Sequence, residues 1–370
     1  MQSNRKLKVL LTNAYAMDKI YELYKKGLCP GHHLYGALEL QKDHNMEVVI
    51  LPHEKYPFLN KIGNWFDIGL MEQQLRAIFA LRKCDILYAP YAAANTKLIV
   101  IGKLFRLIKK PVIILVHQPL FGVPSSKKWK RKLVKKLIMQ YDTLIFLSEQ
   151  MRAELIRDYD IDPEHARKHF FTSHWGVDIN FFQKYNGQNH PEEKRFVISS
   201  GNTARDFDII VKAFERIRFP LKIYCKPESF PKTKVIPENV EIISGNVPFE
   251  MICQDYADAR MILIPLAPNP EGTIGLTSLL EAMAVGKPVI MTRNEKVDVD
   301  IENEKVGMTV EENDVEGWVT SINSMLNNFP LLKEMGDNIY KLGHASFDMN
   351  VFGKELAHVV SDTFKRYQKR

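Results

Sequence analysis

Short apolar runs rich in β-branched residues alternate with longer helical patterns along the whole chain, and no other feature restricts the fold as strongly. In the first half, strands are expected at Lys8–Thr12, Glu47–Leu51, Ile86–Ala89, Val112–Val116 and Thr143–Leu147. In the second half, they are expected at Phe196–Ser199, Leu221–Cys225, Val240–Ile243, Met261–Pro265 and Val289–Thr292. Helices are expected at Leu34–Gln41, Met71–Arg82, Ile101–Ile108, Phe207–Ile217 and Ser278–Val285. This alternation is typical of βαβ units and predicts an α/β fold with two Rossmann-like, doubly wound domains.

The length of 370 residues also favours two domains, because a single domain usually holds about 100–200 residues. A polar stretch rich in turn-forming residues, 183–194, separates the two series of strands. We therefore expect an N-terminal domain over residues 1–185 and a C-terminal domain over 186–350. A last helix, over 351–370, could pack on either domain, and packing back on the N-terminal one is the preferred arrangement.

The localisation expected from the sequence is cytoplasmic. The chain shows no secretory signal pattern, and its apolar runs fall short of the roughly 20 residues that span a bilayer. The four cysteines, Cys29, Cys84, Cys225 and Cys253, lack the spacing of a zinc site or a disulfide framework. Reduced thiols are therefore expected.

The segment after the expected strand at Ile262–Pro265 has the composition of a phosphate site. A loop with Pro268, Pro270 and Gly272 leads to Gly275, where a helical pattern begins. A glycine-containing loop that feeds a helix start exposes backbone N–H groups and the positive end of the helix dipole, which together bind phosphate. Thr277 and Ser278 can add hydroxyl donors.

The run from Glu271 to Ile290, EGTIGLTSLLEAMAVGKPVI, resembles the donor-binding signature of retaining, family-4-like glycosyltransferases of group 1. Two further motifs agree in order and spacing. Residues 201–207 are similar to the first strand–loop–helix of that family's C-terminal domain, and residues 174–182 resemble the segment that closes its N-terminal domain. The resemblance covers most of the chain and implies the GT-B fold, with two Rossmann-like domains facing across a cleft.

By this resemblance, Glu281 binds the donor ribose, and Arg205 clamps the diphosphate together with Thr277, Ser278 and the nearby backbone amides. Glu271 is the weakest assignment, because Thr273 stands where the first acid of the family's acidic pair is usual, and Asn202 stands where an arginine is common. The implied donor-binding set is Gly31, Gly201, Asn202, Arg205, Asn246, Val247, Glu271, Gly272, Thr273, Ile274, Gly275, Leu276, Thr277, Ser278 and Glu281.

Several of these residues also have a purely structural interpretation. Ser278 and Glu281 fit the Ser-x-x-Glu capping box, which stabilises any helix start. Arg205 could be a solvated loop arginine, and residues 245–247 could form a plain turn after a strand. Because the glycine loop and the motif at 201–207 occur in the same domain, the donor site is the favoured interpretation for Ser278, Glu281 and Arg205. For residues 245–247, the nucleobase contact that the resemblance implies and a plain turn are equally expected.

In the first half, His117 follows the apolar run Val112–Val116 and is therefore expected at the end of a strand. The resemblance places a histidine of this region next to the donor sugar, with a role in catalysis alongside Arg205 and Glu281. A hydrogen-bonded structural histidine is the alternative. Gly31 begins a segment that resembles the family's first glycine loop. His32 and His33 follow it, but no third ligand is near in sequence, so neither a metal nor another cofactor is expected.

Basic residues are concentrated in the first half, which has a net charge of +12 against −5 for the second. No acidic residue occurs between Asp85 and Asp142. The densest cluster contains Lys127, Lys128, Trp129, Lys130, Arg131, Lys132, Lys135 and Lys136, with Trp129, Leu133, Leu137 and Ile138 at helical spacing. Such a pattern fits a helix on an anionic membrane surface, but in most proteins it marks a solvated face that covers a buried stripe. The enzyme class that the resemblance implies favours the membrane surface here. Nucleic acid is not expected as a partner, since no nucleic-acid motif accompanies the cluster.

Together these features predict a hexosyltransferase that moves a sugar from a UDP- or GDP-sugar to a hydroxyl of a glycan or lipid-linked acceptor in polysaccharide or glycoconjugate synthesis. Retention at the anomeric carbon is what the resemblance implies. The location would be cytoplasmic, with peripheral contact at the inner face of the membrane. The alternatives are a GT-B nucleotide-sugar hydrolase or epimerase, and an inactive GT-B binding module. The sequence does not identify the sugar, the base or the acceptor.

Overall fold

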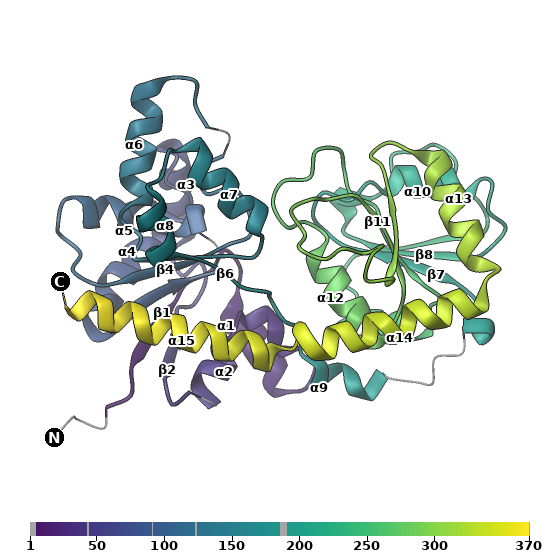
Figure 1. Cartoon of the computed structure of the whole chain (residues 1–370), viewed down its shortest axis with the longest axis horizontal. Coiled ribbons are helices and arrows are strands. Elements are labelled where there is room, and N and C mark those ends of the chain that lie inside the picture. Colours follow the sequence, from purple (N-terminus) through teal and green to yellow (C-terminus); the bar gives the residue numbers. More distant parts are fainter. Residues whose placement is uncertain (1–4, 43, 91, 123, 186–190, 370) are drawn as a thin grey trace. The chain divides into compact units, whose positions relative to one another are not determined.

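The computed structural model describes residues 5–42, 44–90, 92–122, 124–185 and 191–369, and the chain divides into two compact units (Figure 1). Unit 1 comprises Met1–Lys26, Gly31–Trp175 and Met349–Arg370, and unit 2 comprises Gly27–Pro30 and Gly176–Asp348. Part of the boundary expected at 183–194, residues 186–190, lies outside the described residues. Each unit holds its own parallel sheet, which confirms two doubly wound Rossmann-like domains.

The sheet of unit 1 has six parallel strands in the order β2-β1-β3-β4-β5-β6. Helices cover both of its faces, so β3, β4 and β5 are buried along their whole length and, apart from Thr143 at the start of β5, appear in the sequence as apolar runs. The strands are β1 (Lys8–Leu11), β2 (Glu47–Ile50), β3 (Ile86–Ala89), β4 (Val112–Val116), β5 (Thr143–Phe146) and β6 (Phe170–Thr172).

The helices of unit 1 form two layers on the two faces of this sheet. One layer contains α1 (Met17–Lys25), the 3-10 turn η1 (Gly31–Leu34), α2 (Ala37–Lys42) and the last helix, α15 (Met349–Gln368). In the other layer, α3 packs on α4, α4 on α5 and α5 on α6 (Figure 1). Its elements are α3 (Pro57–Trp65), α4 (Met71–Ala80), η2 (Leu81–Lys83), α5 (Ala92–Leu104), α6 (Lys128–Ile138), α7 (Glu149–Asp158) and α8 (Pro163–His169).

The sheet of unit 2 is also parallel, in the order β12-β11-β10-β7-β8-β9. Its strands are β7 (Val197–Ser200), β8 (Leu221–Cys225), β9 (Val240–Ser244), β10 (Ile262–Ile264), β11 (Val289–Thr292) and β12 (Gly307–Val310). The helices are α9 (Ile179–Phe182), α10 (Phe207–Phe214), α11 (Phe249–Asp258), α12 (Leu276–Val285), α13 (Val315–Leu326) and α14 (Phe329–Ser346), with 3-10 turns η3 (Gln183–Tyr185), η4 (Pro191–Glu193) and η5 (Pro227–Ser229). Its core lies between the sheet and helices α10 and α13.

All ten expected strands are confirmed to within one residue at each end. The helix expected at Ile101–Ile108 is wrong in position, because α5 already ends at Leu104 and Arg106 adopts a left-handed conformation that no helix continues through. The helix expected at Ser278–Val285 starts two residues earlier. All four cysteines are free and buried, in agreement with reduced thiols. Among the described helices, none combines the length and apolar character needed to cross a bilayer.

The last helix, α15, belongs to unit 1, where it packs on α2. The Thr363 hydroxyl lies 2.6 Å from the Thr143 hydroxyl in β5, and the Arg366 guanidinium donates to the same Thr143 oxygen at 2.9 Å. Leu356 is buried so close to Gly36 that a Cβ on that glycine would lie 2.5 Å from the leucine Cδ2. Hydrogen bonds to β5 and apolar packing beside α2 therefore hold α15 on unit 1.

Replacing Leu356 by alanine should lower the free energy of unfolding by about 2–5 kcal/mol, because it leaves a cavity between α15 and the rest of unit 1. Lys354→Ala, on the exposed side of the same helix, is the matched control and should change stability by less than about 0.5 kcal/mol. Urea unfolding of the two variants measures the difference. Equal stabilities would show that α15 does not support unit 1.

Candidate functional site

Two loops of unit 2 meet at the carboxyl edge of its sheet, where doubly wound folds bind ligands. They follow the neighbouring parallel strands β7 and β10. The backbone N–H of Ala267 donates to the Ala204 carbonyl at 2.9 Å, and the N–H of Asp206 donates to the Pro265 carbonyl at 3.2 Å. The motif at 201–207 is therefore joined along its backbone to the loop that leads into the motif at 271–290.

Arg205 is the side chain that ties these loops to helix α12. Its Nη2 donates to the Ser278 Oγ at 2.9 Å, its Nε to the Ser200 carbonyl at 3.3 Å, and its Nη1 to the Thr203 carbonyl at 3.1 Å. The side chain is half-buried, and burial lowers the pKa of its guanidinium, an effect that Tyr256 and Glu281 oppose. It is held at the edge of the sheet rather than extended into solvent.

Gly201 makes this position of the arginine possible. Its φ of +150° is unfavourable for other residues, and a Cβ there would lie 2.4 Å from the Nε of Arg205. The guanidinium occupies the space that a side chain at residue 201 would fill. A glycine at the end of β7 is therefore needed for the arginine to lie across the loop.

Helix α12 presents its first turn to the same edge of the sheet. Gly275, with a φ of +97°, precedes the helix and contributes no capping side chain. The Leu276 N–H donates to the Thr273 carbonyl at 3.1 Å. The N–H groups of Thr277 and Ser278 belong to the first turn, where an α-helix offers no intrahelical acceptor, and N–H groups in this position are suited to binding an anion.

The capping-box interpretation of Ser278 and Glu281 is wrong. The helix begins at Leu276, so these residues occupy its third and sixth positions rather than the N-cap and N3 positions that the box requires. Ser278 instead accepts from Arg205 and donates to the Ser200 carbonyl at 3.4 Å. Its hydroxyl joins the two loops and does not stabilise the helix start.

Glu281 lies one turn further along the same face of α12 and is buried. Burial and then the charge of Glu281 raise the pKa of the Tyr256 phenol, and the same two causes raise the pKa of the Cys29 thiol to about 12. The Tyr256 hydroxyl lies 2.7 Å from the Ser200 hydroxyl. Arg205, Ser278 and Glu281 thus share a buried polar cluster with two residues that sequence reasoning missed, Tyr256 and Ser200.

The other residues of the expected donor set surround this cluster at different depths. Thr273 is buried, Ile274 is half-buried and Glu271 is exposed. Asn294 fixes the loop, since its amide donates to the carbonyls of Gly272 and Ile274 at 3.1 and 3.0 Å.

The remaining members lie on other segments. Asn202 is exposed in the loop after β7. Asn246 is exposed and Val247 half-buried, in a tight turn after β9, the edge strand two places from β7. Gly31 is buried at the start of η1 in unit 1.

His117 lies, as expected, directly after β4 in unit 1. Burial lowers the pKa of its imidazole to about 4, although a hydrogen bond to the Pro90 carbonyl opposes the shift. The ring is therefore neutral at physiological pH. A neutral imidazole can accept or donate a hydrogen bond to an uncharged hydroxyl without placing a positive charge beside it.

An aromatic stack flanks His117 within unit 1. The Tyr35 ring lies 6.1 Å from the His117 ring and stacks almost parallel on Trp175, with centroids 4.8 Å apart. Both residues occur inside motifs that the sequence analysis used, yet no signal in the sequence assigned them to a site. The side chain that follows β4 therefore lies beside a pair of stacked aromatic rings.

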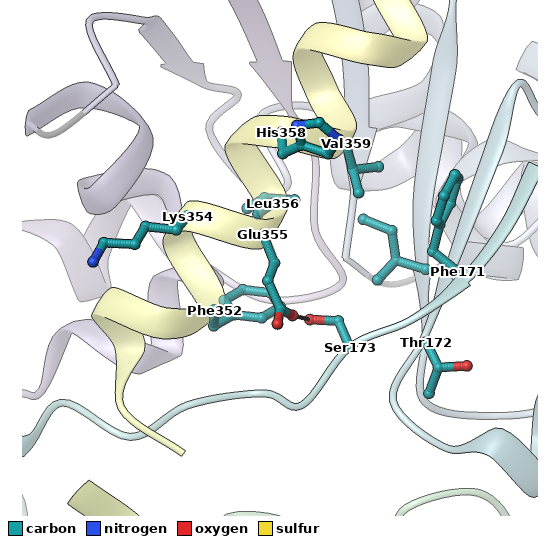
Figure 2. A pocket seen from close by; sticks show the side chains of 10 residues that line it. Phe171, Thr172, Ser173, Phe352, Lys354, Glu355, Leu356, His358 and Val359 are labelled. Carbon is teal, nitrogen blue, oxygen red and sulfur yellow. Dashed lines mark hydrogen bonds between the residues drawn. The ribbon is translucent and has the colours of Figure 1, made fainter. Parts of the chain in front are cut away.

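A cavity of about 380 Å³ lies elsewhere in unit 1, between α15 and the edge strand β6 (Figure 2). Its walls are apolar and include Phe171, Phe352 and Val359, and at its rim the Ser173 hydroxyl donates to Glu355 at 2.5 Å. None of the residues expected in the donor site lines it.

Helix α6 carries the basic cluster expected in the first half. Val134 and Leu137 are half-buried against the core and Ile138 is fully buried, whereas Trp129 and Leu133 are exposed. Of the four apolar residues that the sequence pattern placed on the membrane-facing side of this helix, only Trp129 and Leu133 are therefore exposed. Arg131 and Lys135 donate to the carbonyls of Asp158 and Asp160. The exposed lysines of the cluster are Lys127, Lys128, Lys130, Lys132 and Lys136.

Comparison with known families agrees with this architecture. The profile of the family "Glycosyltransferase Family 4" matches residues 30–168, and that of "Glycosyl transferases group 1" matches residues 195–328. The first match lies in the sheet region of unit 1 and the second contains the polar cluster of unit 2. No curated protein has a sequence that matches this chain.

Solved structures with the same fold include several glycosyltransferases. A glycosyltransferase from Rickettsia africae ESF-5 is similar over 100% of both chains, with 15% identity and a TM-score of 0.65. HepE from Anabaena, solved in complex with UDP-glucose, is similar over 96% of this chain and 99% of its own, with 14% identity and a TM-score of 0.66. WaaG, a glycosyltransferase involved in lipopolysaccharide biosynthesis, shares 14% identity over 96% of this chain and 99% of its own, with a TM-score of 0.60. The fold of this chain is GT-B.

Gly201→Ala should destabilise the protein because the new Cβ displaces Arg205 and breaks its hydrogen bonds, in addition to straining the backbone. Arg205→Ala removes the same bonds, so the double variant should be more stable than the sum of the single effects predicts, by about 0.5–3 kcal/mol. Urea unfolding of the four proteins gives this coupling energy. Strictly additive effects would show that residue 201 does not control the arginine.

The depressed pKa of His117 predicts how stability depends on pH. The imidazole binds a proton near pH 6.5 in the unfolded chain but only near pH 4 in the folded one. Its contribution to stability is therefore complete above pH 6.5 and is lost as the pH falls from 6.5 towards 4, at about 1.4 kcal/mol per pKa unit of difference. In His117→Asn, the loss of stability over this range should be smaller than in the wild type. Parallel pH profiles of thermal unfolding would contradict the burial of a neutral ring.

Proposed function

We propose that this GT-B glycosyltransferase moves a hexose from a UDP- or GDP-sugar to a hydroxyl of a glycan or lipid-linked acceptor, with retention at the anomeric carbon. The observation that carries the proposal is the cluster at the carboxyl edge of the unit 2 sheet. Arg205 and the first turn of α12 there provide positive charge and N–H donors, and Glu281 provides a carboxylate one turn away. A nucleoside diphosphate has the complementary groups, a dianionic diphosphate next to a ribose with two hydroxyls.

Departure of the diphosphate is the step that this geometry assists. Negative charge grows on the leaving diphosphate as the glycosidic bond breaks, and donors already fixed in place stabilise that charge without reorganising. Arg205 is fixed by Gly201 and Ser278, and the helix start is fixed by Asn294 through the loop before it. The proposal therefore needs neither a metal ion nor another cofactor.

Glu281 is proposed to bind the ribose hydroxyls. Its carboxylate is buried, and its charge raises the pKa of the neighbouring phenol and thiols. It therefore acts as a hydrogen-bond acceptor in a poorly solvated site, where a bond to a charged acceptor is stronger than in water. Asn246 and Val247, after β9, are proposed to contact the nucleobase.

Retention is proposed on the family resemblance. The transfer would proceed on one face of the sugar without a protein nucleophile. The acceptor oxygen would bond to the anomeric carbon while the bond from that carbon to the diphosphate breaks, and an oxygen of the leaving diphosphate would take the proton of the acceptor hydroxyl. The neutral His117, held by the Tyr35 and Pro90 contacts, is proposed to hydrogen-bond a hydroxyl of the donor sugar.

The known proteins support the donor class. Both family profiles describe glycosyltransferases, and HepE, which has the same fold, was solved with UDP-glucose. The acceptor is proposed from the exposed lysines of α6, which would hold the enzyme at an anionic membrane surface that carries a lipid-linked acceptor. Work at the inner face of the membrane, in polysaccharide or glycoconjugate synthesis, would follow.

Arg205→Ala and Glu281→Gln should each lower kcat/KM for sugar transfer by about 10²–10³-fold, since each removes a preorganised partner of the donor. Glutamine keeps the shape of the buried Glu281 side chain, so unfolding temperatures should change little for that variant. The matched controls are Arg218→Ala and Glu238→Gln, two exposed residues of unit 2 that should keep wild-type rates. Full activity of both site variants would overturn the assignment.

Ligand binding separates the proposed enzyme from the alternatives. UDP or GDP should raise the unfolding temperature of the wild type, and less so that of Glu281→Gln. A binding module without a donor site would respond to neither nucleotide. A hydrolase or epimerase would consume the nucleotide-sugar at full rate without an acceptor. Proton NMR of the first product formed shows the configuration of the anomeric carbon.

A further inference from the structure

Helix α3 in unit 1 carries its apolar side chains on the outside. Phe58, Ile62 and Trp65 follow one another at spacings of four and three residues, which places them on one face, and all three are exposed. Trp65 is 84% exposed. A helix on a soluble domain normally turns such a face towards the core.

The opposite face of α3 shows why the helix has this orientation. Asn60 is buried, its amide donates to Glu54 at 3.1 Å, and its carbonyl oxygen accepts from the Glu72 N–H at 3.1 Å. A Cβ on Gly63 would lie 2.6 Å from the Met71 Cβ, so only a glycine allows α3 to approach α4 this closely. Specific contacts of the polar face hold the aromatic face outward.

Exposed apolar side chains also occur on the other helices of the layer to which α3 belongs. Helices α3 to α6 pack in succession on one face of the unit 1 sheet (Figure 1). Eleven of the nineteen exposed large apolar side chains in the described part of the chain fall between residues 56 and 133. They are Tyr56, Phe58, Ile62, Trp65, Phe66, Phe79, Ile101, Phe105, Leu107, Trp129 and Leu133, here called the aromatic layer.

The charges on these helices are complementary to an anionic surface. Exposed acidic residues in the described part of 54–142 are Glu54 and Asp67, and Asp67 is paired with Lys97. The exposed basic residues over the same range are Lys55, Lys61, Arg82, Lys83, Arg106, Lys109, Lys127, Lys128, Lys130, Arg131, Lys132 and Lys136. A second copy of this surface would bring like charges together, so self-association through it is disfavoured.

Exposed aromatic rings and cations are also paired directly. The Arg82 guanidinium lies 5.4 Å from the Phe79 ring, and the Lys130 ammonium lies 5.6 Å from the Trp129 ring. Aromatic rings beside cations suit the boundary between lipid headgroups and acyl chains, where the ring enters the apolar region and the cation contacts phosphate.

We propose that the aromatic layer on α3 to α6 inserts into the headgroup region of an anionic lipid bilayer, with α3 supplying apolar anchors and α6 supplying charge. Two signals of this kind are what reversible but firm membrane attachment requires. The inference deepens the proposed function, because it supplies a defined surface that brings unit 1 to a lipid-linked acceptor. It does not depend on donor binding.

The test is flotation of the purified full-length chain with phosphatidylcholine vesicles that contain or lack about one third phosphatidylglycerol. The wild type should float with the anionic vesicles, and at least tenfold less protein should float with the neutral ones, since the charges of α6 act within a Debye length. Trp65→Ser with Phe66→Ser should lower binding to anionic vesicles at least tenfold. Phe230→Ser, an exposed aromatic residue of unit 2, is the control and should bind like the wild type.

Lys128→Glu with Lys132→Glu should weaken binding and reduce its dependence on salt, whereas the Trp65 and Phe66 variant should keep that dependence. Lipids brominated near the headgroup should quench Trp65 and Trp129, because the other two tryptophans, Trp175 and Trp318, are buried. Equal flotation of the double serine variant and the wild type would overturn the proposal. So would concentration-dependent dimers that the same variant abolishes.

Thermal stabilisation by UDP and GDP, measured without vesicles, should be the same in all of these variants. If neither UDP nor GDP stabilises the wild type, the proposed function is overturned but the proposal of a membrane surface is not. Loss of flotation with normal nucleotide binding would overturn only the membrane surface.

Discussion

The hydrogen bond between Arg205 and Ser278 is the contact on which the candidate site of unit 2 depends. It joins the loop after β7 to the helix after β10, and it forms only because Gly201 leaves the space that the guanidinium occupies. Neighbouring parallel strands bring their carboxyl ends to one edge of a sheet, so the two loops must meet. The hydrogen bonds of Arg205 hold the two loops together and place a positive charge at this edge of the sheet.

The balance of charge within this cluster explains how its polar groups can be buried. A buried guanidinium is costly unless polar groups surround it, and two carbonyls and one hydroxyl accept from Arg205. The negative charge of the Glu281 carboxylate also favours the charged form of Arg205. If Arg205 binds the donor diphosphate as proposed, the diphosphate adds acceptors to a cation that is already in position, and little side-chain entropy would be lost on binding.

The sequence predicts much of this architecture, for a physical reason. Strands buried on both faces, such as β4, are apolar along their whole length, and they can therefore be located to within a residue. Arg205 and Ser278 could be predicted as site residues because they lie in the motifs at 201–207 and 271–290. Tyr256 could not, since a buried tyrosine in a helix looks like any core residue until its hydroxyl is seen 2.7 Å from Ser200. The capping-box alternative failed because it depends on the residue at which a helix begins, and patterns locate helix ends poorly.

The orientation of α3 shows a second limit of sequence patterns. Periodicity identifies an apolar face on Phe58, Ile62 and Trp65, but the usual assumption that this face is buried is wrong here. What decides the orientation is the opposite face, where Asn60 finds hydrogen-bond partners and Gly63 allows close approach to α4. Turning α3 over would bury its aromatic rings but would expose these contacts and place bulky side chains where only a glycine fits. The apolar face of α3 therefore stays exposed to water, because the hydrogen bonds of Asn60 and the close contact at Gly63 can form only when the opposite face is buried.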